Sequence, residues 1–225
     1  YFQATKGGGH GDYRMPVLAP ASAQECFDFV QLAFYLADKY SNPAMILSDA
    51  MIGQMMEKVE LRTLEFGPVP EKNWAVKIGR KSKKRESLIH NAPGINIVYQ
   101  EYLKRIKKRH EQMIREEVRY EARDIDDASL ILVAYGSTAR ASMGAYQKAR
   151  EMGLKVGIIR PITLWPFPTQ IIREVAARVP HFLVVEDSLG QMVEDVELAV
   201  QGKAEIHFLG ILARHQPGST GMILP

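Results

Sequence analysis

The chain has 225 residues, of which 46% are hydrophobic and 24% charged, a composition typical of a globular protein with one large or two smaller domains. Its net charge of +3 is too small to indicate nucleic-acid binding, and no apolar run is long enough to span a membrane. The single cysteine, Cys26, excludes an internal disulfide and a cluster held by several thiolates of this chain. One free cysteine fits a reducing compartment, so we expect a cytoplasmic protein.

A glycine-rich segment near the start of the chain is the most informative feature of the sequence. Residues 5–14 read TKGGGHGDYR, so four glycines stand among a lysine, a histidine, an aspartate and an arginine. Glycine lacks a Cβ, which lets the backbone adopt positive φ and approach a ligand closely. The segment matches neither the phosphate-binding loop nor the dinucleotide-binding fingerprint. It indicates a binding site of unassigned class, and a solvated surface loop is the alternative.

A helix is expected from Ser22 to Tyr40, because Ser22 and Glu25 form a capping box ahead of apolar residues at helical spacing. The dipeptide Asn42-Pro43 should end it. We expect its buried face to contain Cys26, Phe27, Val30, Ala33, Phe34 and Ala37.

Two short apolar runs flank this helix, at residues 15–20 and 44–47, and both are typical of buried strands. Asp49 follows the second run, at the carboxyl end of a strand, where ligands bind in doubly wound sheets. Asp49 is therefore a candidate site residue, and a helix-capping role is the alternative.

Residues 61–94 contain several prolines and glycines, so we expect an extended excursion rather than a core element. No aromatic residues are interleaved with the basic residues of this segment, which favours a solvated surface over a nucleic-acid site. A long, highly charged helix is expected at 95–120, and a linker at 123–127. The basic run consists of Lys77, Arg80, Lys81, Lys83, Lys84 and Arg85.

From residue 128 to residue 225, strands and helices alternate, which predicts a parallel sheet with right-handed crossovers. No dense set of acid, base and nucleophile occurs in this half, and we assign no metal ligands. His181, His207 and His215 stand apart in the sequence and are expected to be structural or solvated. The expected strands are 130–135, 155–159, 181–186 and 205–210, and the expected helices are 138–152, 169–179 and 191–200.

Four motifs resemble the α subunits of 2-oxoacid:ferredoxin oxidoreductases, in particular the branched-chain, 2-oxoisovalerate type. They lie at residues 1–14, 18–25 and 39–57 and, in the second half, at 134–140 together with 160–168. The glycine-rich loop is the most specific of them, whereas the motifs of the second half recur across thiamine-dependent enzymes. The likeness covers most of the chain outside the excursion.

The resemblance implies an α/β fold of two domains with parallel sheets. Residues 1–60 would be the C-terminal part of a pyrimidine-binding thiamine-enzyme domain, and 61–127 an extended excursion, charged helix and linker. Residues 128–225 would be a transketolase C-terminal-like domain. The first part of the pyrimidine-binding domain, which holds the glutamate that activates thiamine, would be missing from this chain.

The resemblance also implies an activity: CoA-dependent oxidative decarboxylation of 2-oxoisovalerate to an acyl-CoA, with electrons passed to ferredoxin. Thiamine diphosphate and Mg²⁺ would lie at the interface with a β subunit. Iron–sulfur clusters would lie in partner chains only, because this chain has a single cysteine. With γ and ferredoxin-like subunits and a second α chain, these would form a heteromeric complex that binds neither nucleic acid nor a membrane.

Within this resemblance the glycine-rich loop carries the expected site. Lys6, His10 and Arg14 are the candidate catalytic residues, because a substrate carboxylate needs cationic partners and a histidine can shuttle protons. For Arg14, an ion pair with Asp12 that shapes the loop is the alternative. The candidate cofactor-binding residues are Gly7, Gly8, Gly9, Gly11, Asp12 and Asp49.

Three other interpretations remain open from the sequence. The same reaction could act on 2-oxoglutarate or pyruvate. A dehydrogenase β subunit that uses lipoamide would share the second-half motifs, although the glycine-rich loop argues against it. A non-catalytic assembly subunit of a thiamine-dependent complex would explain the incomplete set of acid and base residues.

Overall fold

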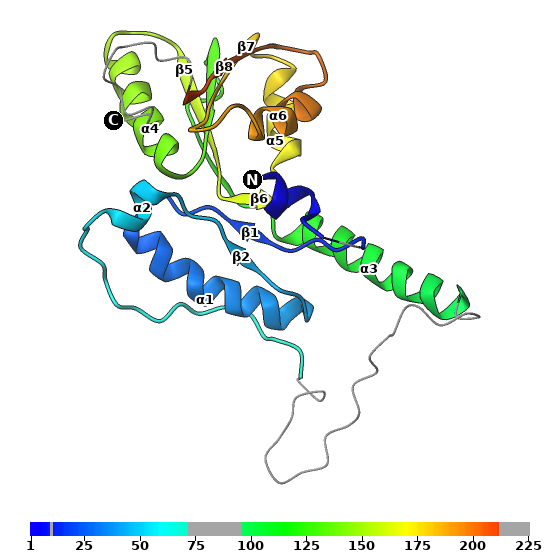
Figure 1. The fold of residues 1–225 in the computed structure, drawn as a ribbon. Helices are drawn as coiled ribbons and strands as arrows, with labels where there is room; N and C mark the ends of the chain where they lie inside the picture. The colour runs from blue at the N-terminus through cyan, green and yellow to red at the C-terminus, as the bar shows by residue number, and fades with distance from the viewer. Residues whose placement is uncertain (10, 72–95, 212–225) are drawn as a thin grey trace.

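The computed structural model describes residues 1–9, 11–71 and 96–211, which form two α/β halves stacked on each other (Figure 1). The first half comprises η1 (Gln3–Gly7, one π-helical turn), β1 (Val17–Leu18), α1 (Ala23–Tyr40), β2 (Met45–Ile46), α2 (Ala50–Gln54) and α3 (Asn96–Glu116). The second half comprises β3 (Tyr120–Arg123), β4 (Leu130–Ala134), α4 (Gly136–Glu151), β5 (Val156–Pro161), β6 (Thr163–Trp165), α5 (Thr169–Ala176), β7 (His181–Val185), α6 (Met192–Val200) and β8 (Glu205–Leu209).

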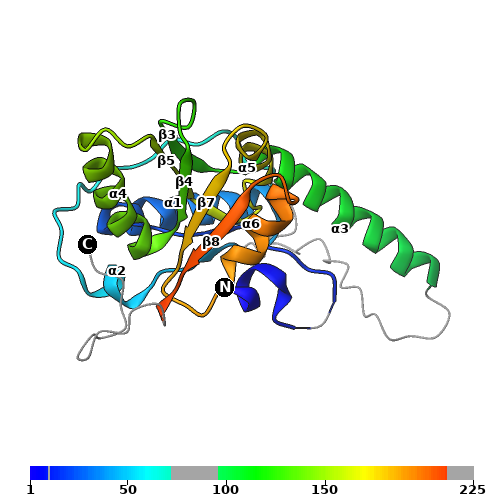
Figure 2. The ribbon, with the colours of Figure 1, turned by 90° about the horizontal axis from the view of Figure 1, so that it is seen from above.

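The expected α/β class is confirmed. In the second half, β5, β4, β7 and β8 are parallel neighbours, with α4 on one face of the sheet and α5 and α6 on the other (Figure 2). The sheet ends at β3, which pairs antiparallel with β5. The expected charged helix therefore stops at Glu116 rather than continuing to Tyr120, because Tyr120 starts this edge strand.

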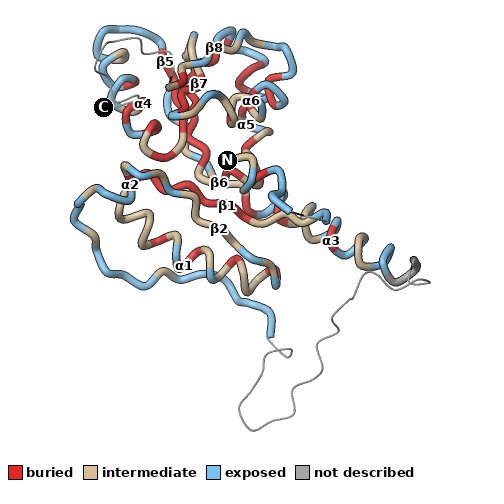
Figure 3. The backbone as a smooth tube through the Cα atoms, in the orientation of Figure 1, coloured by how far each residue is buried: buried red, intermediate tan, exposed pale blue. Residues whose placement is uncertain are grey.

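The first half has a smaller sheet in the order β2-β1-β6. The strands β1 and β2 are parallel, as expected, and β6 returns from the second half to pair antiparallel with β1. Two segments far apart in the chain thus share one sheet. Figure 3 shows that the buried backbone is concentrated in the central strands, whereas most of α3 is exposed or half-buried.

The helix α1 begins as expected, since the Ser22 hydroxyl accepts a hydrogen bond from the Glu25 N–H at 3.1 Å. Its expected buried face is wrong: Val30 is 47% exposed, Phe34 is 71% exposed, and Cys26 is only half-buried. Burial nevertheless raises the pKa of the Cys26 thiol. The helix is apolar on more than one side, and its docking geometry selects the buried residues Asp28, Leu32, Leu36 and Tyr40.

Another side of α1 is covered by residues 55–71, which have neither helix nor strand and include the start of the excursion expected from residue 61. Asp28 pairs with Arg62 at 2.5 Å, and the rings of Tyr35 and Phe66 stack with centroids 4.9 Å apart. The hydrogen bond from Arg62 is the main cause that lowers the pKa of Asp28. The expected basic run, Lys77 to Arg85, lies outside the described residues, as do His10 and His215.

Side-chain contacts join the two halves. The buried Arg160 of β5 donates hydrogen bonds from both terminal nitrogens to the carboxylate of Glu25 in α1. Its Nη1 lies 2.9 Å from Glu25 Oε1. Arg140 of α4 lies 2.7 Å from Glu57 and donates to the Ala21 carbonyl at 3.2 Å. No helix in the described part of the chain is long and apolar enough to cross a membrane.

A buried carboxylate ties α1 to the end of α3. Glu117 is 1% exposed and accepts hydrogen bonds at 2.7 Å from Lys39, Tyr40 and Arg119. Burial alone would raise the pKa of Glu117, but these hydrogen bonds outweigh it and lower the pKa below its usual value. The hydrogen bond from Lys39 likewise lowers the pKa of the neighbouring Glu116 to about 2.

The Glu117→Gln variant should be about 2 kcal/mol less stable than the parent protein near neutral pH. Because the pKa of Glu117 is depressed in the folded chain, its contribution is present above the pKa of the unfolded chain and is lost as the pH falls through the lower pKa of the folded chain. Urea titrations near neutrality and in acid should therefore show the difference shrinking on acidification. A difference independent of pH would contradict an electrostatic role for Glu117.

Candidate functional site

The glycine-rich loop folds as η1 followed by an irregular run into β1. Gly7 and Gly11 have φ values of +93° and +94°, a region that favours glycine. A Cβ at Gly8 would lie 2.6 Å from Gln3 Cγ, and the Gly8 N–H donates to the Tyr13 hydroxyl at 2.6 Å. The backbone path thus favours glycine at Gly7, Gly8 and Gly11.

Residues at the start of the chain bind to α6 and to the residue before it through hydrogen bonds and an ion pair. The two carboxylate oxygens of Asp195 accept from the Tyr1 hydroxyl, at 2.5 Å, and from the Lys6 ammonium in an ion pair. The Phe2 N–H donates to the Gln191 side chain at 3.3 Å. Burial, followed by the charge of Asp195, raises the pKa of Tyr1. Lys6, predicted to bind substrate, is therefore held by a carboxylate 189 residues away, which no local pattern could reveal.

The Arg14 side chain contacts the backbone of η1 and does not pair with Asp12. Its Nη1 donates to the Thr5 carbonyl at 3.3 Å, and Asn42 donates to the Arg14 carbonyl at 3.0 Å. The alternative interpretation of Arg14, an ion pair with Asp12, is not found among the described residues. Arg14 thus contacts the backbone of η1 and shapes the loop through that contact.

His110 of α3 is a buried titratable group that the sequence interpretation did not consider. Its Nε2 is buried without a hydrogen-bond partner in the described structure, and its ring meets Trp165 edge-on at 5.7 Å. Burial, with the charges of Arg109 and Arg14, lowers the pKa of His110, whereas Asp12 raises it. The His110 imidazole thus lies within electrostatic reach of Asp12 and Arg14. Only its position on a charged helix could have hinted at it.

A cavity of about 300 Å³ opens beside the loop. Gly8, Gly9 and Tyr13 form one side, and none of the nine lining residues carries a charge. The loop thus meets an aromatic and aliphatic wall, whose other members are Tyr1, Gln3, Ala4, Met15, Met45 and Leu47.

Asp49 joins two helix starts. Its Oδ1 accepts from the Ile52 N–H at 2.9 Å, which caps α2, and its Oδ2 accepts from the Ser137 N–H at 2.7 Å at the start of α4. Gly136 has φ +61°, and a Cβ there would lie 2.6 Å from Asp49 Oδ2. The capping alternative describes these contacts, and a cofactor role for Asp49 remains a prediction.

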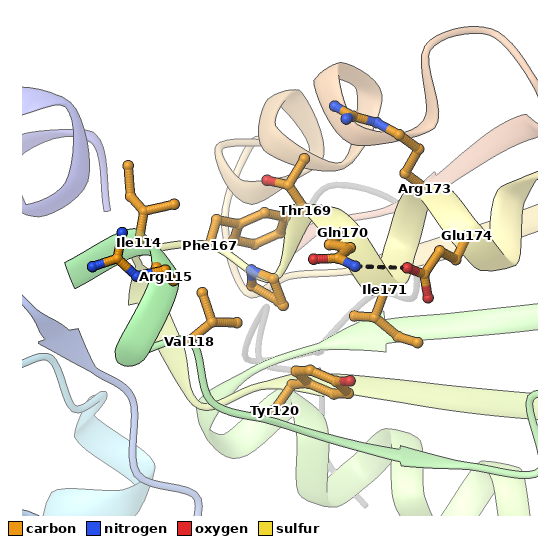
Figure 4. Close-up of a pocket in the computed structure, with 11 residues that line it drawn as sticks. Ile114, Arg115, Val118, Tyr120, Phe167, Thr169, Gln170, Ile171, Arg173 and Glu174 are labelled. Atoms are coloured by element: carbon orange, nitrogen blue, oxygen red, sulfur yellow. Dashed lines mark hydrogen bonds between the residues drawn. The ribbon is translucent and has the colours of Figure 1, made fainter. Parts of the chain in front are cut away.

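A larger cavity, of about 590 Å³, lies between the end of α3, the start of β3 and α5 (Figure 4). Arg115, Tyr120 and Arg173 line it, and Gln170 donates to Glu174 at 2.9 Å along α5. It contains none of the site residues expected from the sequence.

Comparison with known families gives two adjoining matches. Residues 2–124 match the family described as "Pyruvate flavodoxin/ferredoxin oxidoreductase, thiamine diP-bdg", and residues 128–219 match "Pyruvate:ferredoxin oxidoreductase core domain II". The boundary between them falls in the segment expected to link the two halves.

Curated relatives agree with these matches. The chain is 41% identical over 202 residues to the ketoisovalerate oxidoreductase subunit VorB of Methanothermobacter thermautotrophicus, covering 88% of this chain and 56% of that protein. It is 30% identical over 226 residues to the 2-oxoglutarate synthase subunit KorA of the same organism, covering 90% and 60%. The chain thus spans little more than half the length of these relatives.

The fold has a solved counterpart. The 2-oxoglutarate:ferredoxin oxidoreductase of Magnetococcus marinus superposes with a TM-score of 0.67 at 21% identity, covering 93% of this chain and 41% of that one. More than half of the chain matches the thiamine diphosphate-binding family, and the core domain II match follows directly. The chain belongs to the pyruvate flavodoxin/ferredoxin oxidoreductase family.

Proposed function

We propose that the chain is part of the α subunit of a 2-oxoacid:ferredoxin oxidoreductase that converts 2-oxoisovalerate, CoA and oxidised ferredoxin into acyl-CoA, CO₂ and reduced ferredoxin. Two VorB relatives, at 41% and 42% identity, support this over the KorA relatives at 30% and 31%. The uncharged cavity beside the glycine-rich loop is the observation that carries the substrate class.

The lining of that cavity suits a branched aliphatic chain. Met15, Met45 and Leu47 offer apolar surface, and Gly8 and Gly9 bring the backbone of the loop to the same space. A 2-oxoglutarate side chain would bring a second carboxylate, which needs a cation or several N–H donors when buried. Lys6 is the cation nearest in sequence to the lining residues Gly8 and Gly9, and its ammonium is already paired with Asp195 rather than free for a second carboxylate.

Thiamine diphosphate, when bound, supplies the electron sink for decarboxylation. The uncharged aromatic and aliphatic residues that line the cavity beside the loop fit its organic part or the substrate rather than its diphosphate and metal. Among the described residues, the one group of three or more metal-ligating side chains that lie together is His181, Glu205 and His207, on β7 and β8. We therefore assign the diphosphate and Mg²⁺ chiefly to a β subunit.

The remaining partners follow from the same assignment. Iron–sulfur clusters require several thiolates, and this chain has a single cysteine, so γ and ferredoxin-like subunits would carry them. A second copy of the α chain would complete the assembly, in the cytoplasm. His10, outside the described residues, remains a candidate proton carrier.

The Met15→Ala variant tests the cavity assignment in the assembled complex. Removing part of an apolar wall should lower kcat/KM for 2-oxoisovalerate about tenfold, because lost methylene contacts cost roughly 1–3 kcal/mol. The kcat/KM for pyruvate, whose methyl group reaches less of the wall, should fall less. Met56→Ala is the matched control, since Met56 is 99% exposed. An equal loss for both substrates would contradict the assignment.

A further inference from the structure

Two histidines and a glutamate that stand apart in the sequence meet at the β7–β8 edge of the second sheet. His181 starts β7, and Glu205 lies directly opposite it at the start of β8. His207 is two residues beyond Glu205, and strand side chains alternate faces with a period of two. All three side chains therefore project from the same face, and all three residues are exposed.

The spacing of their ligand atoms is that of a metal site. His181 Nδ1 lies 3.4 Å from His207 Nε2 and 3.4 Å from Glu205 Oε2, while Glu205 Oε1 lies 3.8 Å from His207 Nε2. Two ligands at Zn–N distances of about 2.0–2.1 Å and a tetrahedral angle are separated by about 3.4 Å. Both imidazoles and the carboxylate can thus reach one ion with little movement.

The surroundings leave this cluster accessible and held by rigid elements. The helix α4 packs against Leu132 and Ile158 of β4 and β5, whereas each histidine side chain remains 46% exposed at the β7–β8 side. A shallow cavity of about 440 Å³ lies there, lined by Ser129, Leu130, His181, Leu183 and His207. The β7–β8 ladder, with His181 opposite Glu205 and Leu183 opposite His207, sets the ligand positions.

We propose that His181, Glu205 and His207 form a three-ligand site for a first-row transition-metal ion of the Zn²⁺ class. Two neutral imidazoles and one carboxylate are a ligand set that zinc accepts, and a fourth position stays open for water or another ligand. The ion would join β7 to β8, which is the edge strand of this sheet among the described residues. Because an edge strand lacks a partner on one side, this link would stabilise the sheet where it is weakest.

Equilibrium dialysis of the purified complex against Zn²⁺, followed by elemental analysis, tests the site without recourse to activity. The parent complex should hold one more zinc per copy of this chain than the His181→Ala and His207→Ala variants. The His90→Ala variant, which removes a histidine from the excursion, should match the parent. Zinc should also raise the unfolding temperature of the parent but not of the two cluster variants.

Equal zinc content in the parent and the cluster variants would overturn the proposal, whatever the total. A cluster variant that failed to assemble would be replaced by Glu205→Gln, which keeps the size of the side chain and removes the anionic ligand. Circular dichroism of each variant without zinc establishes that the fold is intact. An intact Glu205→Gln variant with undiminished zinc affinity would equally overturn the site.

Discussion

Replacing Glu186 by glutamine should lower the free energy of unfolding by about 3 kcal/mol. Glu186 follows β7, is 1% exposed, and accepts hydrogen bonds from the backbone N–H groups of Gln191, Met192 and Val193. Met192 N and Val193 N lie 2.9 Å from its oxygens. A buried carboxylate at this position satisfies the N–H groups at the start of α6 and interacts favourably with the helix dipole.

The glutamine amide would turn an NH₂ group towards donors that need an acceptor, so the penalty exceeds the loss of one hydrogen bond. Because Asp195 lies in α6 and Gln191 directly before it, their contacts with residues 1–6 should weaken together with the helix. Urea titration measures the change, and Glu194→Gln is the matched control, since Glu194 is exposed in the first turn of the same helix. Similar losses in the two variants would contradict the capping role of Glu186.

The Arg160→Met variant should lose about 4 kcal/mol of unfolding free energy, because removing one member of a buried ion pair leaves the other charge uncompensated. Arg160 lies in β5 and is 5% exposed, and its guanidinium donates to Glu25 across the interface between the two halves. It also lies within 3.5 Å of Glu121 in the neighbouring strand. The same side chain therefore links two strands of the second sheet to α1.

Glu25 also binds the backbone ahead of α1, since its Oε2 accepts a hydrogen bond from the Ala21 N–H at 2.7 Å. Without Arg160 this carboxylate would have to be solvated or protonated, and the entry into α1 would loosen with the interface. Arg123→Met is the control, because Arg123 is an exposed arginine on β3. Differential scanning calorimetry should show one cooperative transition moving down in temperature; an unchanged transition would show that Arg160 does not hold the halves together.

Local signals predicted much of the fold. The Ser22 cap sets the start of α1, and the runs of Val, Ile and Leu in the second half lie where strands form. The strands β3 and β6 were not foreseen, because each is short and pairs across the chain with an element whose position the sequence does not encode locally. The buried face of α1 was predicted wrongly for a similar reason. Several sides of this helix are apolar, and the elements that pack against it determine which side is buried.

The candidate site divides in a similar way. The glycine-rich loop could be predicted from its composition, because a backbone path that leaves no room for a side chain at Gly8 requires glycine there. The residue that holds the loop in place could not be predicted, because Asp195, the partner of Tyr1 and Lys6, lies far along the chain. His181 and His207 stand 26 residues apart and meet only through the register of two parallel strands.

The central claim is the oxidation of a branched-chain 2-oxoacid, and the most direct measurement is CoA-dependent reduction of ferredoxin or methyl viologen by the assembled complex. 2-Oxoisovalerate, 2-oxoglutarate and pyruvate should be compared at matched concentrations. We predict the highest kcat/KM with 2-oxoisovalerate. A preference for 2-oxoglutarate would contradict the substrate class, and no turnover with any 2-oxoacid, in a complex shown to contain thiamine diphosphate and iron, would contradict the oxidoreductase function itself.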